Sequence, residues 1–519
     1  MPRPLRHLAV LSLILLALVL RVLCLPSQPV DADEAMHLHP RPAAEALTFD
    51  LMFNPPLYRA ATATLCEIDR SVTAARLLPV AAGTLSVLLL YLLGARTVGM
   101  GPALLAAFLL AIHPWHIRHS QTLRCFALLT FLVLLSELLA RGRSRAEAHG
   151  PDATPVSLPP PGDTLPAHTA DSGRATTDHW SVPSFRSRRC GLLLLPLVLG
   201  LGMLTHYLAF FHAAAQAARS FLAGRKRTSL AIAVTSALVA ASLLPFLLAG
   251  TERKVTDGGV PYQAGLPFLW SLARASFAPG GLSLFAALLL AVLGTTCRAA
   301  RPFLLPAGIW IGTTLLAGTA IPIEVRYCLP ALPFLLLLLA AGTWTLWQKR
   351  RLAAAVVTLL AVAGVLWPLP DYYRAPRDPA PALAIHPDLS HVEADMEPLL
   401  PELRRAASRA VPIFAAVRGP FHYRLAAEIH DGRYPDDAVL VEQDDCSILT
   451  AGSLRVVTAE PRHVPTGVPG GPCLLLREPS FPCTPAATCS PAGSSLGMEL
   501  FSCLAVACAA FPCKAEGPP

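Results

Sequence analysis

The sequence predicts an all-α polytopic membrane protein that carries a small α/β domain at its C-terminal end. Three observations support this fold class. The 519 residues are 54% hydrophobic and only 15% charged, with a mean hydropathy of +0.51, whereas soluble domains carry about a quarter charged residues. The apolar residues form runs long enough to cross a bilayer, and short clusters of arginine and lysine separate the runs. The hydropathy falls only after Pro370, where the soluble domain is expected to begin.

The first apolar segment runs from Leu5 to Leu25 after a basic start. The residues that precede Pro26 are not the small residues that a cleavage site needs, so we expect an uncleaved signal-anchor helix. With its N-terminus in the cytoplasm, residues 26–74 become an external loop. The loop is acidic, because three carboxylates fall within four residues, at Asp31, Asp33 and Glu34.

The remaining apolar runs alternate with basic clusters, which cytoplasmic loops collect. They bring the expected total to about eleven crossings, in one transmembrane domain over residues 1–370. Between the fourth and fifth crossings, residues 146–189 are rich in Pro, Ser, Thr and Asp and are expected to form a disordered cytoplasmic linker. The expected later spans lie at 76–93, 104–112, 123–139, 192–222, 230–248, 282–293, 303–320, 329–347 and 352–367.

The run over 192–222 is too long for one crossing, and basic clusters flank it on both sides, at Arg188–Arg189 and Arg225–Arg227. Both ends should therefore be cytoplasmic, which requires two short crossings joined by an external tip near 205–207. Polar residues at such a tip are tolerated where they line a cavity. This topology places His206 on the same side of the membrane as the acidic loop.

After the last crossing, residues 371–478 read as a soluble extracytoplasmic domain. A helix is expected over 392–410, and buried strands are expected at 437–441 and 454–457. Residues 479–519 form a tail rich in Cys and Pro. Seven of the thirteen cysteines lie from Cys446 onward, which indicates an oxidising compartment and agrees with the charge-based topology.

Several short segments form a recognisable combination, through their order along the chain and the side of the membrane on which each is predicted to lie. They are Asp33–Ala35, Asn54–Tyr58, Ala75–Pro79, His113–Ile117, Ser120–Leu128, Leu204–Tyr207 and Arg326–Pro333. Together they resemble the GT-C type membrane glycosyltransferases, the group of the protein O-mannosyltransferases and aminoarabinose transferases (glycosyltransferase family 39-like). The resemblance extends from Leu8 to Trp367 and is strongest before Ala140.

The resemblance implies an inner-membrane enzyme that takes a sugar from a polyprenyl-phosphate carrier and gives it to an extracytoplasmic lipid, glycan or protein. It also implies inversion at the anomeric carbon and no nucleotide-sugar donor. The acidic pair of the family falls on Asp33 and Glu34. The chain departs from the family at Thr122, where relatives often carry Glu, and at Phe126, where they often carry Tyr.

The acidic loop is the candidate for base catalysis, because glycosyl transfer needs a base near the acceptor group. We assign this role to Asp33, while Glu34 or Asp31 would orient Asp33 or bind the acceptor. The alternative is an exposed acidic loop without chemistry.

Arg76, Arg124 and Arg326 each stand at the external end of a predicted span. The guanidinium fork donates two parallel hydrogen bonds to phosphate, so these residues are candidates for holding the donor. Snorkelling to lipid headgroups is the alternative. His206 and Tyr327 are assigned to the same donor site. The alternative for His206 is a polar residue at the membrane interface whose hydrogen bonds are satisfied there. His119 and Gln121 are further possible members of the site.

Other ligands and functions fit the sequence less well. Neither His37 and His39 nor the cysteine-rich tail offers ligands at metal spacing, so no metal or other cofactor is expected, although a divalent ion stays possible. Nucleic acid is excluded, because the basic residues form no contiguous domain. A transporter would need internal repeats or mid-span acids, which the sequence does not show. A non-catalytic envelope-assembly protein would keep the topology without an acidic loop.

Overall fold

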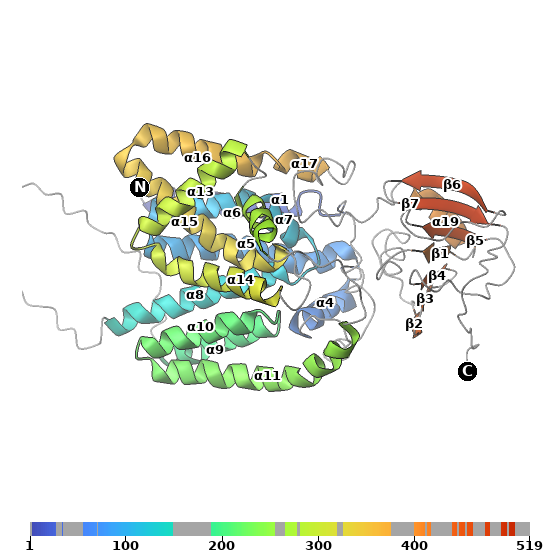
Figure 1. Ribbon diagram of the computed structural model, residues 1–519, viewed down its shortest axis with the longest axis horizontal. Coiled ribbons are helices and arrows are strands. Elements are labelled where there is room, and N and C mark those ends of the chain that lie inside the picture. Colours follow the sequence, from blue (N-terminus) through green and yellow to red (C-terminus); the bar gives the residue numbers. More distant parts are fainter. Residues whose placement is uncertain are drawn as a thin grey trace, which may run out of the picture.

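The computed structural model describes residues 3–26, 28, 34, 56–69, 71–148, 188–254, 265–277, 281–318, 325–374 and 399–409, together with the β-strands between 413 and 503. These residues form a helical bundle with a β-sheet at one end (Figure 1). Most of the predicted acidic loop and of the predicted 146–189 linker lie outside the described residues.

The helices follow the predicted crossings in order along the chain. The first half of the bundle contains α1 (Arg3–Val22), α4 (Pro56–Ile68), α5 (Val72–Thr97), α6 (Met100–Ile112), α7 (Pro114–Gln121) and α8 (Phe126–Ala148). The second half contains α9 (Arg188–Met203), α10 (Ala209–Leu222), α11 (Lys226–Lys254), α12 (Leu266–Phe277), α13 (Gly281–Thr296), η1 (Arg301–Phe303), α14 (Leu304–Ala317), η2 (Val325–Ala331), α15 (Leu332–Lys349), α16 (Arg351–Leu366) and α17 (Leu369–Arg374). The 192–222 run is divided into α9 and α10 by a turn at 204–208, as predicted.

The chain is a multi-pass membrane protein. Within the described residues, three helices are long and apolar enough to cross a membrane, and the count reaches five if the bent pairs α6–α7 and α12–α13 are each one span. Helices α10, α13, α14 and α16 have only 14 to 16 residues, fewer than the roughly 20 that a full crossing requires. Eleven crossings therefore stay a prediction.

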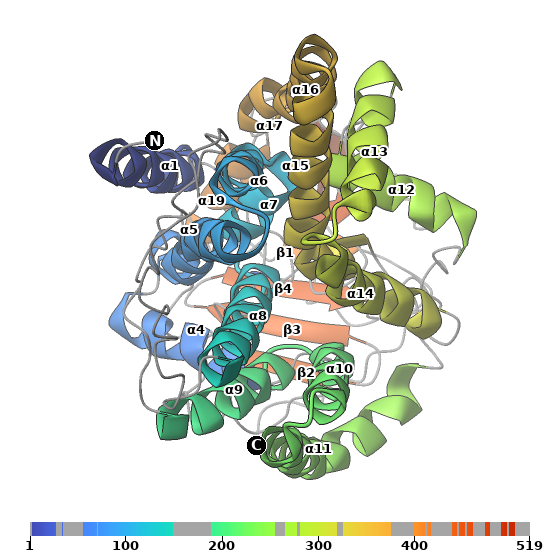
Figure 2. The same ribbon diagram turned by 90° about the vertical axis from the view of Figure 1, so that its left-hand side faces the viewer.

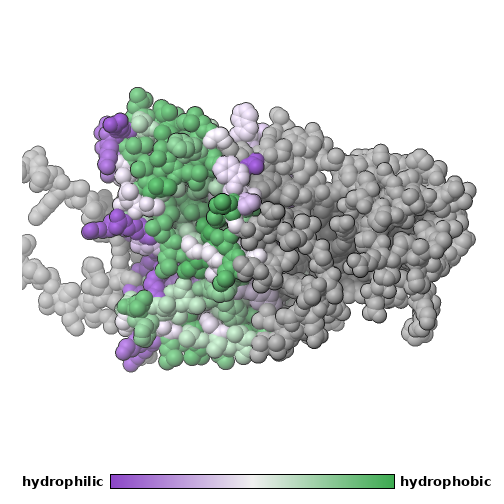
Figure 3. Space-filling view, in the orientation of Figure 1, coloured by the Kyte–Doolittle hydropathy of each residue, from purple (hydrophilic) through white to green (hydrophobic). Residues whose placement is uncertain are grey.

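The surface of the bundle carries a broad hydrophobic band with hydrophilic residues at its left-hand edge (Figure 3). The short turns from α10 to α11 and from α15 to α16 lie at that edge (Figure 1). Exposed basic residues lie at or beside these turns, among them Lys226, Arg227, Lys349 and Arg350. Since cytoplasmic loops collect such residues, this edge corresponds to the predicted cytoplasmic side.

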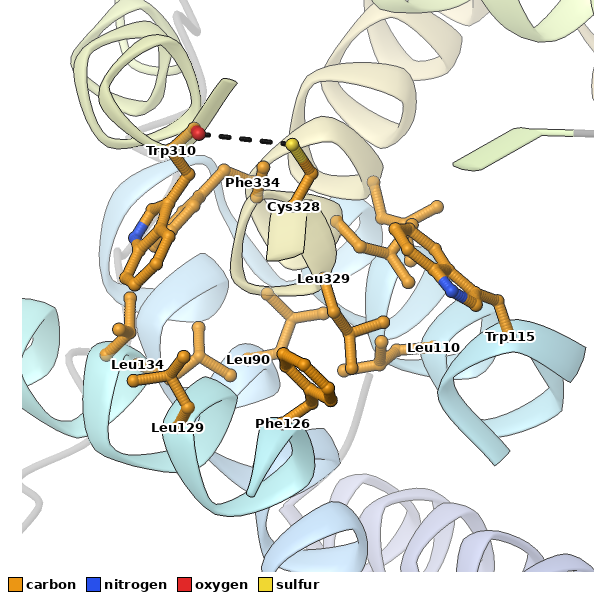
Figure 4. Packing of buried hydrophobic residues seen from close by; sticks show 14 of the residues in the cluster. Leu90, Leu110, Trp115, Phe126, Leu129, Leu134, Trp310, Cys328, Leu329 and Phe334 are labelled. Atoms are coloured by element: carbon orange, nitrogen blue, oxygen red, sulfur yellow. Dashed lines mark hydrogen bonds between the residues drawn. The ribbon is translucent and has the colours of Figure 1, made fainter. Parts of the chain in front are cut away.

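Two glycines let α13 and α15 approach each other closely. A Cβ atom on Gly294 would lie 1.9 Å from the carbonyl oxygen of Leu338, and one on Gly342 would lie 1.8 Å from that of Leu290. Such small residues at helix crossings are typical of membrane bundles. Nearby, Leu329 lies among apolar side chains that include Leu90, Leu110 and Phe126, and the Cys328 thiol donates to the Trp310 carbonyl at 3.9 Å (Figure 4).

The described strands after the bundle form one sheet in the order β2-β3-β4-β1-β5-β7-β6. Their bounds are β1 Ile413–Ala416, β2 Val439–Gln443, β3 Cys446–Ala451, β4 Leu454–Ala459, β5 Cys473–Arg477, β6 Cys489–Ser495 and β7 Met498–Cys503. β1 pairs in parallel with β4 and β5, and the other pairs are antiparallel. β2 and β4 overlap the two predicted strands, and α19 (Leu400–Ser408) overlaps the predicted helix. Viewed along the bundle, the strands lie behind its helices (Figure 2).

Candidate functional site

The C-terminal end of α1 is held by side chains from distant elements. The last carbonyl groups of a helix have no partner within the helix. The Gln121 amide nitrogen donates to the carbonyl oxygens of Arg21 at 3.0 Å and Leu23 at 2.8 Å. The guanidinium of Arg76, on α5, donates to those of Leu25 and Gln28, each at 3.0 Å. The segment that leads into the acidic loop is therefore fixed against α5 and α7.

Arg21 reinforces this end of α1 from within the bundle. It is fully buried, and its guanidinium contacts Nδ1 of His116 at 2.7 Å and donates to Ser120 Oγ at 3.3 Å. Gly83 on α5 makes room for these groups, because a Cβ there would lie 2.0 Å from Ser120 Oγ and 3.0 Å from Arg21 Nε. The guanidinium also donates to the carbonyl oxygens of Ala17, Leu110 and Ala111.

Glu34 and Arg76 form a buried, two-pronged ion pair. Arg76 Nε donates to Glu34 Oε1 at 2.9 Å, and Arg76 Nη2 donates to Oε2 at 2.7 Å. The backbone N–H of Leu123 also donates to Oε1. Both side chains are 1% exposed or less, so the pair depends on good geometry and on these additional hydrogen bonds to offset desolvation.

This pair changes the reading of Arg76, which the sequence suggested as a phosphate ligand. All three of its guanidinium nitrogens donate to Glu34, Leu25 or Gln28. That arrangement favours a role in anchoring the acidic loop. Asp31 and Asp33 lie outside the described residues. Glu34 is the one residue of the acidic stretch 31–34 that the structure describes.

A second group of predicted site residues gathers around Phe126, at the start of α8. The Tyr327 ring lies 5.4 Å from the ring of His206, and the Phe126 ring lies 5.8 Å from each of them. The Arg326 guanidinium carbon stands 5.9 Å from the centre of the Phe126 ring, within the range of a cation–π contact. Three aromatic rings and one cation thus converge from α8, η2 and the turn between α9 and α10.

Arg124 brings a second cation close by, because it lies two residues before Phe126 in the chain. His206 is held neutral beside Arg326, because burial and, secondarily, the Arg326 charge lower its pKa to about 4.

The structure thus separates the predicted residues into two groups joined by the turn at 122–125. His119 belongs to the aromatic group, since its ring meets Trp115 and Phe126 edge-on at 6.3 Å and 5.3 Å. Gln121 belongs to the anchor of α1. The turn links the groups because Leu123 binds Glu34 and the next residue is Arg124. Phe126, which the sequence marked only as a departure from a family pattern, is the ring that the others surround.

A buried acid that the sequence reading missed lies further along α8. Glu137 is 1% exposed and accepts hydrogen bonds from Gln216 at 2.5 Å, Arg219 at 3.1 Å and Arg141 at 3.2 Å. The spacing of Glu137 and Arg141, four residues apart on one helix, was the available signal. This cluster ties α8 to α10 away from the candidate site. Among the described residues, no group of three His, Cys, Asp or Glu could hold a metal ion.

The lowered pKa of His206 predicts a pH-dependent stability. Between its ordinary pKa of 6.5 and about 4, the unfolded chain binds a proton that the folded protein excludes, so stability falls as the pH falls. Replacing His206 with glutamine removes this contribution. We expect the melting temperature to fall less from about pH 7 to about pH 5 in the variant than in the original protein. An equal fall in both proteins would show that His206 is readily protonated in the folded state.

Comparison with known proteins gives structural relatives only. No protein-family model matches the chain, and no curated protein matches its sequence. The structure resembles ArnT from Cupriavidus metallidurans bound to undecaprenyl phosphate, with a TM-score of 0.54, 14% identity and coverage of 97% of this chain and 99% of that one. The apo state of ArnT gives a TM-score of 0.52 at 12% identity, covering 96% and 97%.

The archaeal oligosaccharyltransferase AglB from Archaeoglobus fulgidus, in complex with an inhibitory peptide and a dolichol-phosphate, gives a TM-score of 0.45 at 13% identity, over 83% of this chain and 64% of that one. ArnT is an aminoarabinose transferase with the GT-C fold. Because ArnT matches nearly end to end, the chain has the GT-C fold that its sequence motifs suggested.

Proposed function

We propose that this protein transfers a sugar from a polyprenyl-phosphate carrier to an acceptor on the extracytoplasmic side of the inner membrane. The observation that carries the proposal is the convergence of Arg326 with three aromatic rings, one of which, Phe126, follows Arg124 by two residues. The fold adds support, because ArnT, which shares it, was crystallised with undecaprenyl phosphate.

The two arginines suit the phosphate that leaves in such a reaction. When the bond between the anomeric carbon and the phosphate oxygen breaks, negative charge grows on that oxygen. Fixed guanidinium groups stabilise such charge, most strongly where little water is present. The neutral imidazole of His206 adds no further charge beside them and can accept or donate one hydrogen bond.

Asp33 is the proposed base. It would take the proton of the acceptor hydroxyl or amine as the acceptor atom attacks the anomeric carbon, and polyprenyl phosphate would leave on the opposite face. This is the inverting course that the family resemblance implies. The ion pair between Glu34 and Arg76 would hold Asp33 in place, and Asp31 would assist in binding the acceptor. The acceptor is a lipid, glycan or protein, and the domain that contains the sheet would bind it or cover the site.

Binding of undecaprenyl phosphate tests the arginine assignments. The full-length protein in lipid nanodiscs is titrated with undecaprenyl phosphate, and the variants Arg124→Lys and Arg326→Lys are compared with it. Lysine keeps the charge and loses the fork, which removes about one charge-assisted hydrogen bond. We expect the dissociation constant to rise about 10- to 100-fold for each variant.

A matched control is Arg298→Lys, an exposed arginine in the turn after α13, which should bind as the original protein does. Unchanged affinity for undecaprenyl phosphate in both site variants would show that the phosphate does not bind at Arg124 and Arg326. A transporter would bind the carrier as well, so the second measurement is the appearance of a glycosylated product, detected by mass spectrometry of envelope glycans in cells with and without the protein.

A further inference from the structure

Two adjacent tyrosines connect the end of the bundle to the base of the acidic loop. Tyr372 and Tyr373 lie on α17, the short helix that follows α16 and leads toward the sheet (Figure 1). The Tyr372 hydroxyl donates to the side-chain oxygen of Gln121, and the Tyr373 hydroxyl donates to the backbone carbonyl of Leu20 on α1. These hydrogen bonds join residues that are 251 and 353 positions apart in the chain.

Tyr372 sets the orientation of the Gln121 amide. The amide nitrogen of Gln121 donates to the carbonyls at the end of α1 only when the amide oxygen points the other way, and that oxygen accepts from Tyr372. A tyrosine hydroxyl is a suitable donor here because burial raises the pKa of Tyr372 above its ordinary value of 10, so the hydroxyl keeps its proton. Removing the hydroxyl would leave the amide free to turn.

The carbonyl groups that Gln121 and Arg76 hold are close in the chain, because Gln121 binds that of Leu23 and Arg76 binds that of Leu25. The two tyrosine rings also meet edge-on, with centroids 5.1 Å apart, so they are in contact with each other. Tyr372 is 7% exposed. Buried polar networks of this kind define one arrangement when every member is satisfied.

We propose that Tyr372 and Tyr373 are positioning residues, which couple α17 to the C-terminal end of α1 and so keep the ion pair of Glu34 and Arg76 in place. The proposed role in sugar transfer rests on the function proposed above. The physical coupling does not, and it can be measured by itself.

Native cysteines report on the coupling. Cys24 lies partly exposed in the turn after α1, between two carbonyls that Gln121 and Arg76 hold. Cys297, equally partly exposed, lies after α13 and serves as the control thiol. The full-length protein is treated with N-ethylmaleimide, and the labelling rate of each thiol is followed by peptide mass spectrometry.

We expect Cys24 to react about 5- to 10-fold faster when Tyr372→Phe and Tyr373→Phe are combined, because the hydrogen bonds that resist opening of the turn are lost. Labelling of Cys297 should not change. Tyr91→Phe removes the same atom from a buried tyrosine on α5 and is the matched control variant. Unchanged Cys24 labelling in the double variant would overturn the coupling.

The role in transfer is tested by separating binding from turnover. In the double tyrosine variant we expect product formation to fall about 10-fold, while the affinity for undecaprenyl phosphate stays within about twofold, since the arginines that hold phosphate are untouched. Faster Cys24 labelling with undiminished product would overturn the role in transfer. A failure of the proposed function itself would give a different result, namely normal product formation by the Arg326→Lys variant. In that case the labelling rate of Cys24 would still decide whether the coupling exists.

Discussion

Replacing Glu34 with glutamine is expected to lower the free energy of unfolding by about 3–5 kcal/mol, because one member of a buried ion pair is removed and the other keeps its charge. The guanidinium of Arg76 is 1% exposed, so water cannot replace the lost carboxylate. The Leu123 N–H loses its charged acceptor as well. The measurement is thermal and denaturant unfolding of the full-length protein in detergent.

The chain offers a matched control for this substitution. Glu402 and Arg405 on α19 form an ion pair of the same 2.7 Å length, but their side chains are 38% and 57% exposed. Glu402→Gln should change the stability by less than about 1 kcal/mol. The combination of Glu34→Gln with Arg76→Met should recover part of the loss, since no buried charge remains. If the Glu34→Gln variant has the same free energy of unfolding as the original protein, the buried charge of Arg76 does not need the carboxylate of Glu34.

Replacing Asp33 with asparagine should have the largest effect on activity. Loss of a general base typically slows a reaction by about 10²- to 10⁴-fold. Asparagine has nearly the same shape but cannot take the acceptor's proton, so we expect transfer to fall by that factor while unfolding and undecaprenyl phosphate binding stay unchanged. The product is followed by mass spectrometry of envelope glycans, with the purified variant tested for folding in parallel.

Glu67 provides the control for Asp33, because it is an exposed carboxylate near the end of α4, in the same predicted external loop. Glu67→Gln should form product at the normal rate. A normal rate in Asp33→Asn would transfer the base assignment to another group. Together the variants of Asp33 and Glu34 distinguish two neighbouring carboxylates, one expected to act in chemistry and the other in holding the loop.

The sequence was a good guide where one physical rule decided the outcome. Bilayer thickness and the placement of basic residues located the helices, and the charge rule divided the 192–222 run at the turn that carries His206. The same rule put Arg124, His206 and Arg326 at helix ends on one side. His206 and Arg326 do meet around Phe126, which follows Arg124 by two residues in the chain.

The sequence was a poor guide where a partner comes from far along the chain. Arg76 looked like a phosphate ligand because its position and chemistry suit one, and nothing local shows that Glu34 occupies its fork. Gln121 was only a possible member of the site, and its amide holds carbonyl groups of α1. The last carbonyl groups of a helix take their hydrogen-bond donors from elsewhere in the protein. The three-dimensional path of the chain decides which donor reaches each carbonyl, and hydropathy contains no information on that path.

The hydrogen bonds at the end of α1 also set the order in which the protein can be completed during its synthesis. The carbonyl oxygen of Leu20 on α1 receives a hydrogen bond from Tyr373, which is synthesised 353 residues later. At about 5–20 residues per second, that donor follows after roughly 20–70 seconds. Until then, α1 and the start of the acidic loop lack part of their anchorage. The candidate site is therefore expected to reach its final form only after α17 has been synthesised and has packed against α1.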